Sequence, residues 1–430
     1  MKSNAIIAII VSLVVLGAAF VVLTSDLFID SNTIDSNKES EDEIPEALGN
    51  KTSFNDAVNA FAFDLFRKIF NDPVNEGNIF YSPYSVFTAL AMTYEGARNN
   101  TADEMESVLS IEQDNDSFHQ YMKSLYEYLN ENADYNISTA NALWVRENFE
   151  LLEEYIKTIE TYYGGRSSEV DFSKPEEAAE IINQWVENQT NNLIKNLVPP
   201  EVIDPVMTML ILTNAIYFKG TWQIKFAEAN TTDRDFMDYE GNIIEVPTMR
   251  LTRTENKFNY TETEELKILE LPYTGNEISM TILLPREGVE LSDVINSIDK
   301  DSISEWIDSM YETEVDIYLP KFKFETSYGL NDYLIELGMQ DAFSDFADFS
   351  GIDGRPDLFI SNVLHKAFIN VSEEGTEAAA ATAVVIDLKS IDGGGSSRTV
   401  FDADHPFLFL IQHKETGTVI FLGSISNPLA

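Results

Sequence analysis

Residues 52–430 are one long stretch without a second linker, an internal repeat or a low-complexity break before a glycine cluster late in the chain. Such a stretch predicts one large domain of about 380 residues rather than a string of small ones. Helices dominate its first half, beginning where Ser53 can cap a helix. The apolar positions of that helix are Val58, Phe61, Leu65 and Ile69.

Short apolar or alternating runs further along are typical of strands. They lie at residues 209–218, 278–285 and 315–325. Helices followed by many strands, without a strict β-α-β alternation, predict an α+β fold.

The charge balance excludes several classes of function. The chain has 28 basic and 73 acidic side chains, a formal net charge of −45. A surface this negative repels phosphate backbones, so we expect neither nucleic-acid nor polyanion binding. There is no cysteine, which excludes disulfides, thiolate metal sites and a cysteine nucleophile. A hydrophobic share of 44% nevertheless allows a large core.

The N-terminal 51 residues read as a leader and a spacer. Residues 5–23 are uncharged and apolar, with Lys2 before them and Asp26 and Asp30 after them. Two readings stay open for residues 1–25: a cleaved signal peptide, or a retained anchor that tethers the protein to a membrane. Both place the remainder outside the cytoplasm. Residues 26–51 are acidic and aperiodic, as in a flexible linker.

The sequence contains no recognisable catalytic motif. The four histidines, His119, His365, His405 and His413, occur in no metal-ligand spacing. No nucleophile elbow, phosphate-binding loop or dinucleotide fingerprint is present. We therefore expect no catalytic residue, no cofactor and no metal site, and a binding protein rather than an enzyme.

Residues 372–397 differ in local composition from the segments on either side of them. Local propensity in EEGTEAAAATA favours a helix, because Ala and Glu are strong helix formers. Read with a period of two, the same residues suit a strand with one face of small side chains. Gly375 would let the backbone hinge before that strand. The members of the small face are Thr376, Ala378, Ala380 and Thr382.

This segment makes the sequence recognisable. FINVSEEGTEAAAATAVVI (368–386) resembles the reactive-loop hinge of the serpins, a family of serine protease inhibitors. Residues 78–105, 182–200 and 210–222 are similar to early and central family segments, and ADFSGI, HPFLFLI and FLGSISNP to later ones. The resemblance covers residues 52–430 in the family's order. It implies the serpin fold, in which helices pack on three β-sheets and a reactive loop, here residues 373–404, is exposed.

The resemblance also implies a mechanism. A serine protease would cut the loop and remain attached as an acyl complex, while the loop inserts as a new strand in the large sheet. Glu373, Glu374 and Gly375 match the start of the hinge. Counting the usual loop length from Gly375 gives Lys389–Ser390 as the reactive bond, which suits a trypsin-like or subtilisin-like protease. Because the loop is longer than usual, Arg398–Thr399 stays an alternative.

Other positions take roles by resemblance alone. Arg250 would form an ion pair with Glu373, and Trp222 would pack where the loop enters the sheet. The cluster under the sheet, whose hydrogen bonds switch when strands part, would comprise Ser82, Ser85, Asn214 and His365. The segment at 116–132 carries Lys123 among several acids, so heparin-like activation is not expected. We expect a monomeric inhibitor, with a non-inhibitory binding or carrier protein of the same fold as the alternative.

Overall fold

The computed structural model describes residues 53–111, 115–130, 132–376 and 398–430. The predicted leader and linker, and loop residues 377–397, lie outside this range. Within the described residues no helix is long and apolar enough to cross a membrane. Residues 5–23, the predicted anchor or signal peptide, lie outside the described residues.

The N-terminal half is rich in helices, as predicted. The first begins at Ser53, and Val58, Phe61, Leu65 and Ile69 are all buried along it. The second begins at Pro83, where Ser82 accepts a hydrogen bond from the Ser85 amide, a typical N-cap with proline in the first turn. The six helices among the described residues of this half are α2 (Ser53–Phe70), α3 (Pro83–Tyr94), α4 (Asn99–Leu109), α5 (Asn115–Asn130), α6 (Glu153–Tyr162) and α7 (Pro175–Gln189).

The described helices of the second half are short. They are α8 (Leu291–Ser297), α9 (Lys300–Asp308), α10 (Asn331–Leu337) and α11 (Ser350–Asp353). The described strands of both halves form three sheets, which together with the helices give the predicted α+β class.

A seven-stranded sheet carries much of the core. All its pairings are antiparallel, and its central strands β9, β16 and β17 are buried along their whole length. In spatial order the strands are β1 (Ile79–Tyr81), β17 (Val419–Ile425), β16 (Phe407–His413), β9 (Ile278–Pro285), β8 (Leu266–Pro272), β7 (Phe258–Glu262) and β10 (Tyr311–Thr313).

A four-stranded sheet receives the chain after the loop. Its order is β15 (Thr399–Asp402), β11 (Val315–Pro320), β6 (Ile243–Leu251) and β5 (Thr232–Met237). β15 runs parallel to β11 and the other pairs are antiparallel. The run predicted at 315–325 is therefore two strands in two different sheets. It divides after Pro320, where the Lys321 amide donates to the Pro247 carbonyl.

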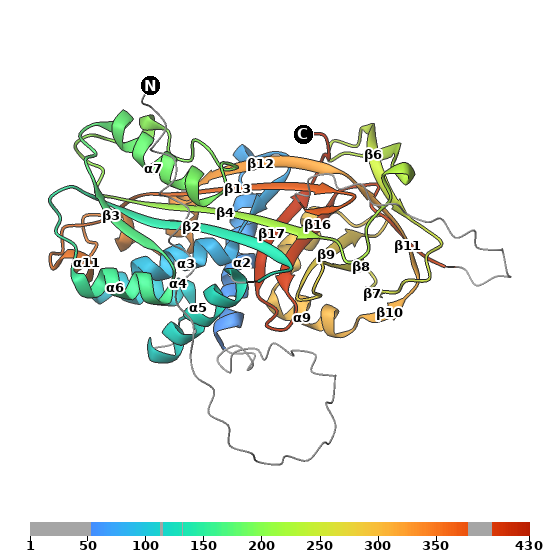
Figure 1. Cartoon of the computed structure of the whole chain (residues 1–430), viewed down its shortest axis with the longest axis horizontal. Helices are drawn as coiled ribbons and strands as arrows, with labels where there is room; N and C mark the ends of the chain where they lie inside the picture. Colours follow the sequence, from blue (N-terminus) through green and yellow to red (C-terminus); the bar gives the residue numbers. More distant parts are fainter. Residues whose placement is uncertain (1–52, 112–114, 131, 377–397) are drawn as a thin grey trace, which may run out of the picture. The chain divides into compact units, whose positions relative to one another are not determined.

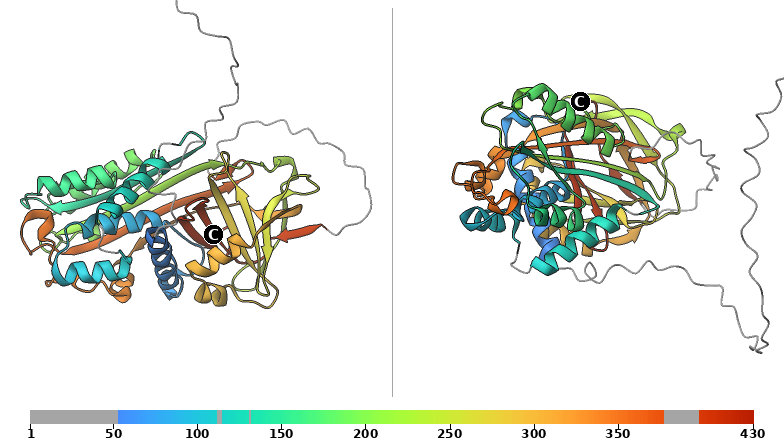
Figure 2. Two further views of the ribbon diagram at one scale, coloured as in Figure 1. Left: turned by 90° about the horizontal axis from the view of Figure 1, so that it is seen from below. Right: turned by 60° about the vertical axis from the view of Figure 1, so that its left-hand side comes forward.

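The six-stranded sheet is the one that positions the site. Its order is β12 (Phe322–Gly329), β13 (Ile360–Ser372), β14 (Gly375–Thr376), β4 (Leu210–Thr221), β2 (Tyr135–Arg146) and β3 (Arg166–Val170). Helix α7 packs on one face of β2, and α3 packs on the other face of β2 and β4 (Figure 1). The views in Figure 2 show β4 and β13 side by side along the sheet.

Candidate functional site

The centre of the six-stranded sheet is closed at one end and wedged open at the other. β13 and β4 pair directly and in parallel from Ile360 to Ala367. Beyond that point the chain reverses through Glu373 and Glu374, and β14 enters between the two strands. Thr376 lies opposite Val371 on β13 and opposite Gly220 on β4. Thr376, the first residue of the predicted inserting face, is therefore already in a strand, and the helix interpretation does not apply to it.

Two glycines make this close approach possible. Gly375 has a φ of +148°, and a Cβ on it would lie 2.1 Å from the Gly220 carbonyl oxygen. A Cβ on Gly220 would lie 2.7 Å from the Tyr273 ring. Both positions need a residue without a side chain, because a backbone or a packed ring occupies the space. At Gly375 the turn therefore passes too close to β4 for any side chain.

Aromatic side chains enclose β14. Trp222 donates from its amide to the Glu374 carbonyl and from Nε1 to the Ser372 carbonyl, each at 2.9 Å. Its ring stacks on that of Tyr273 with 4.5 Å between centroids. The Tyr273 hydroxyl lies 2.6 Å from Thr376 Oγ1, and burial raises the pKa of Tyr273. Trp222 thus packs beside the turn that leads into β14, and no local signal in the sequence pointed to Tyr273.

The acidic residues of the turn have basic partners, though not the one predicted. Glu373 pairs with Lys321 at 2.8 Å and accepts a hydrogen bond from the Thr231 hydroxyl at 2.7 Å. Burial pushes the pKa of Glu373 upward, but the bonds from Lys321 and Thr231 outweigh it and hold the pKa below its usual value. Glu374 pairs with Lys225.

The predicted ion pair between Arg250 and Glu373 is wrong. Arg250 Nε donates instead to the Asn230 carbonyl at 3.0 Å, and among the described residues Glu373 has its ion pair with Lys321. The reason is where the strands end. β11 ends at Pro320, so Lys321 follows directly and reaches the turn, while Arg250 is held beside Asn230.

A buried polar cluster lies where β13 and β4 are still paired. Ser82, Ser85, Asn214 and His365 do come together there, each fully buried. His365 Nε2 accepts a hydrogen bond from the Ser82 amide at 3.1 Å, so Nδ1 carries the proton and donates to Asn214 Oδ1. Asn214 Nδ2 donates to Ser85 Oγ at 2.5 Å. The cluster ties two strands of the sheet to the start of α3.

The cluster has a fifth member that was not predicted, Asn141. Its Oδ1 accepts from Ser85 Oγ at 2.9 Å and also from Asn214 Nδ2. Asn141, Asn214 and His365 lie in register on β2, β4 and β13, so one rung of the sheet carries three polar side chains. An asparagine inside a buried strand was the available signal, since buried amides need partners.

His365 is neutral in this environment. Complete burial lowers its pKa to about 3, and no carboxylate is among its hydrogen-bond partners. A proton on Nε2 would also face the Ser82 amide, which already donates to that atom. The cluster therefore stays uncharged at neutral pH.

The family-level comparison agrees with this geometry. A family model described as Serpin (serine protease inhibitor) matches residues 56–428. The chain belongs to the serpin family. An uncharacterised serpin-like protein of Thermococcus kodakarensis is 42% identical over 86% of this chain and 85% of its own. The leukocyte elastase inhibitor of Equus caballus is 40% identical over 86% of this chain and 97% of its own.

Solved serpin structures have the same fold. That of Serpin48, a highly specific serpin in the insect Tenebrio molitor, superposes with a TM-score of 0.78 at 36% identity. It covers 87% of this serpin and 98% of its own chain. The serpin fold is thus confirmed.

The far end of this serpin's loop is firmly attached. Arg398 pairs with Glu314 at 2.7 Å and with Asp316 at 3.1 Å, and its guanidinium also donates to the Thr254 carbonyl. Thr399 begins β15 and lies opposite Val315. The alternative bond Arg398–Thr399 is therefore held by side-chain and strand contacts. Lys389, Ser390, Ala378, Ala380 and Thr382 lie outside the described residues.

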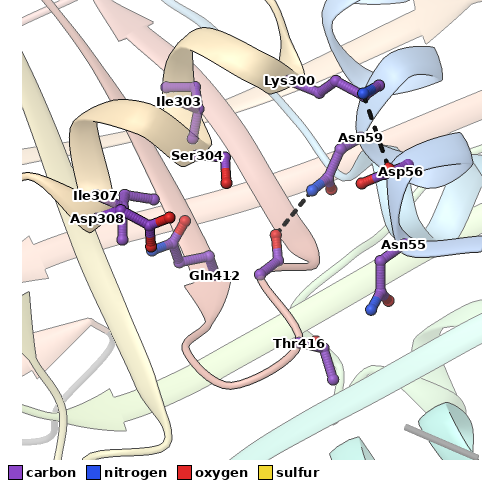
Figure 3. Close-up of a pocket in the computed structure, with 11 residues that line it drawn as sticks. Asn55, Asp56, Asn59, Lys300, Ile303, Ser304, Ile307, Asp308, Gln412 and Thr416 are labelled. Atoms are coloured by element: carbon purple, nitrogen blue, oxygen red, sulfur yellow. Dashed lines mark hydrogen bonds and ion pairs between the residues drawn. The ribbon is translucent and has the colours of Figure 1, made fainter. Parts of the chain in front are cut away.

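A separate pocket lies between α2, α9 and the turn that joins β16 to β17 (Figure 3). Asn59 Nδ2 donates across it to the Gly417 carbonyl at 2.8 Å, and Lys300 pairs with Asp56 at 3.8 Å. Its lining shares no residue with the hinge or the polar cluster. Among the described residues no group of three His, Asp or Glu side chains could hold a metal ion.

Proposed function

We propose that this serpin is an irreversible inhibitor of a trypsin-like or subtilisin-like serine protease. The observation that carries the proposal is β14, because the first residues of the loop already pair with both strands between which the loop must insert. The protein itself supplies a substrate bond and a sheet that opens, and no catalytic group.

The register of β14 supports full insertion. If β14 continued between β4 and β13 in the same register, Ala378 and Ala380 would lie opposite Phe218 and Ile216 of β4. Thr382 would lie between Asn214 and His365 and would face the side on which their side chains meet. Small residues therefore enter the narrow part of the sheet. A hydroxyl arrives at the polar cluster, where it can replace the hydrogen bond that the parting strands lose.

The chemistry comes from the protease. Its serine oxygen attacks the carbonyl carbon of Lys389, the Lys389–Ser390 bond breaks, and the amine of Ser390 leaves with the proton from the serine hydroxyl. The protease then remains on Lys389 as an ester. Insertion of the freed strand moves that ester away from the loop's original position before water can hydrolyse it.

Lys389–Ser390 is the better candidate for this bond. A protease has to extend the bond it cuts through its own active site, and Arg398 and Thr399 would first have to leave β11, Glu314 and Asp316. A lysine also fits a pocket with a carboxylate at its floor. For the partner we propose a protease of this specificity, without activation by a heparin-like polyanion.

The test is incubation with trypsin. We expect a complex that resists SDS, and mass spectrometry should find a released C-terminal peptide that begins at Ser390. A released peptide that begins at Thr399 would show that the reactive bond is Arg398–Thr399 instead. Complete cleavage without a complex, and without a rise in thermal stability, would favour the binding or carrier alternative.

We also propose that the protein acts outside the cytoplasm, either secreted or anchored by residues 5–23. The support is the apolar leader followed by an acidic spacer. N-terminal sequencing of the mature protein from cells distinguishes the two forms. A start near residue 26 means cleavage, and a start at the first residues together with recovery in the membrane fraction means an anchor.

A further inference from the structure

The hydrogen bond between Tyr273 and Thr376 joins the hinge to a different sheet. Tyr273 follows β8 of the seven-stranded sheet, and Thr376 ends the described part of β14. Tyr273 is fully buried, and Thr376 is 2% exposed. A hydroxyl in such a place needs a partner, and here each hydroxyl is the partner of the other at 2.6 Å.

The Tyr273 ring is fixed by contacts that do not involve Thr376. It stacks on Trp222, and Phe218 meets it edge-on with 5.0 Å between centroids. Gly220 closes the space beside it. The position of the hydroxyl is therefore set by the packing of the ring, and the inserting strand meets a fixed hydrogen-bonding group.

β14 itself is short. It has two residues, each with one partner on β13 and one on β4. A slip by one residue would turn Glu377 toward Tyr273 in place of Thr376, and would turn the small face of the strand away from the interior. The backbone hydrogen bonds of either register are chemically alike, so the packing at Gly375 and the side-chain contacts of Thr376 have to select between them.

We propose that Tyr273 is a positioning residue for loop insertion, which fixes the register of the inserting strand through the hydroxyl of Thr376. The inference rests on the proposed inhibitory function. With Thr376 held, Ala378, Ala380 and Thr382 follow on the same face. Without the bond, fewer hinges start in the productive register, insertion slows, and more of the acyl complex hydrolyses.

The experiment compares five variants of the full-length protein, four single ones and the double variant Tyr273→Phe/Thr376→Val. Tyr273→Phe removes the hydroxyl and keeps the ring, Thr376→Val removes the partner hydroxyl, and Thr376→Ser keeps it. Tyr260→Phe is the matched control, because its buried hydroxyl also lies in the seven-stranded sheet but bonds to Glu262. For each variant we would measure the inhibitor consumed per trypsin inactivated and the hydrogen exchange of the Gly375 and Thr376 amides.

We expect Tyr273→Phe and Thr376→Val each to speed exchange at these amides about five-fold, and to raise the fraction of inhibitor cleaved without inhibition by a similar factor. The double variant should do no more than either single one, and Thr376→Ser should stay near wild type. Exchange unchanged in Tyr273→Phe, or additive effects in the double variant, would overturn the inference. If the wild type forms no complex, the proposed function fails, but the exchange data still test the bond.

Discussion

His365 on β13 donates a hydrogen bond from Nδ1 to Oδ1 of Asn214, its partner in register on β4. Above this rung the two strands separate around β14, so the bond lies on the path that further insertion must take. It joins strands that have to part, and both side chains keep other partners in α3 or β2. Opening the sheet there breaks this one bond without leaving either side chain wholly unpaired.

Protonation of His365 should destabilise the fold. The pKa of His365 is about 3 in the folded protein and 6.5 in the unfolded chain. The contribution of His365 to the unfolding free energy is therefore fully present above pH 6.5 and falls as the pH drops toward 3. Between pH 7 and pH 5.5 this residue alone should remove about 1 kcal/mol from the unfolding free energy. His413, whose pKa burial lowers to about 4, acts in the same direction, whereas the raised pKa of His405 acts against it.

The measurement is the urea midpoint of wild type and His365→Gln at both pH values. The variant should lose less stability on acidification than wild type, because the other histidines are common to both. Equal losses would show that His365 is not the group that titrates.

The ion pair between Glu373 and Lys321 should contribute more to the unfolding free energy than Arg250, the partner that the family resemblance suggested. Glu373 is buried, so removal of Lys321 leaves its charge with the Thr231 hydroxyl as its main partner. Lys321→Gln should lower the unfolding free energy by about 1–3 kcal/mol, and Arg250→Gln should change it by less than about 1 kcal/mol. Thermal unfolding of both variants tests this order, and a larger loss in Arg250→Gln would contradict it.

Gly375→Ala should expel β14. The new methyl group would lie 2.1 Å from the Gly220 carbonyl oxygen. In addition, the backbone of residue 375 has a φ of +148°, which residues with a side chain rarely adopt. We expect trypsin to cleave this variant largely as a substrate, with little stable complex on a denaturing gel. Gly241→Ala is the control, since Gly241 also has a positive φ but open space around its Cβ position. Equal inhibition by the two variants would contradict the steric argument.

Thr376→Arg should abolish inhibition and leave cleavage intact. Thr376 points into a closed space beside Tyr273, where a guanidinium would be buried without a carboxylate partner. We expect trypsin to release the same C-terminal peptide as from wild type, with no covalent complex and no gain in melting temperature after cleavage. A stable complex would show that the loop inserts by another route.

Much of the fold could be predicted from the sequence. The helical spacing from Val58 to Ile69 and the strand runs at 209–218 and 278–285 are local patterns, and each was confirmed within a few residues. The family followed from long motifs in order. The run at 315–325 was predicted as one strand but forms two strands in different sheets. The alternation of side chains continues where the chain leaves one sheet and enters the other, so the sequence pattern does not show the break.

The sequence by itself determined the family, the run of small residues that we propose to insert, and four of the five members of the polar cluster, because the family's motifs occur here in order. Only the tertiary structure decided that Lys321, not Arg250, meets Glu373, and that Tyr273 meets Thr376. Those contacts join residues 52 and 103 positions apart. Which side chains meet over such separations depends on where each strand ends and how the sheets pack, and no local pattern encodes either.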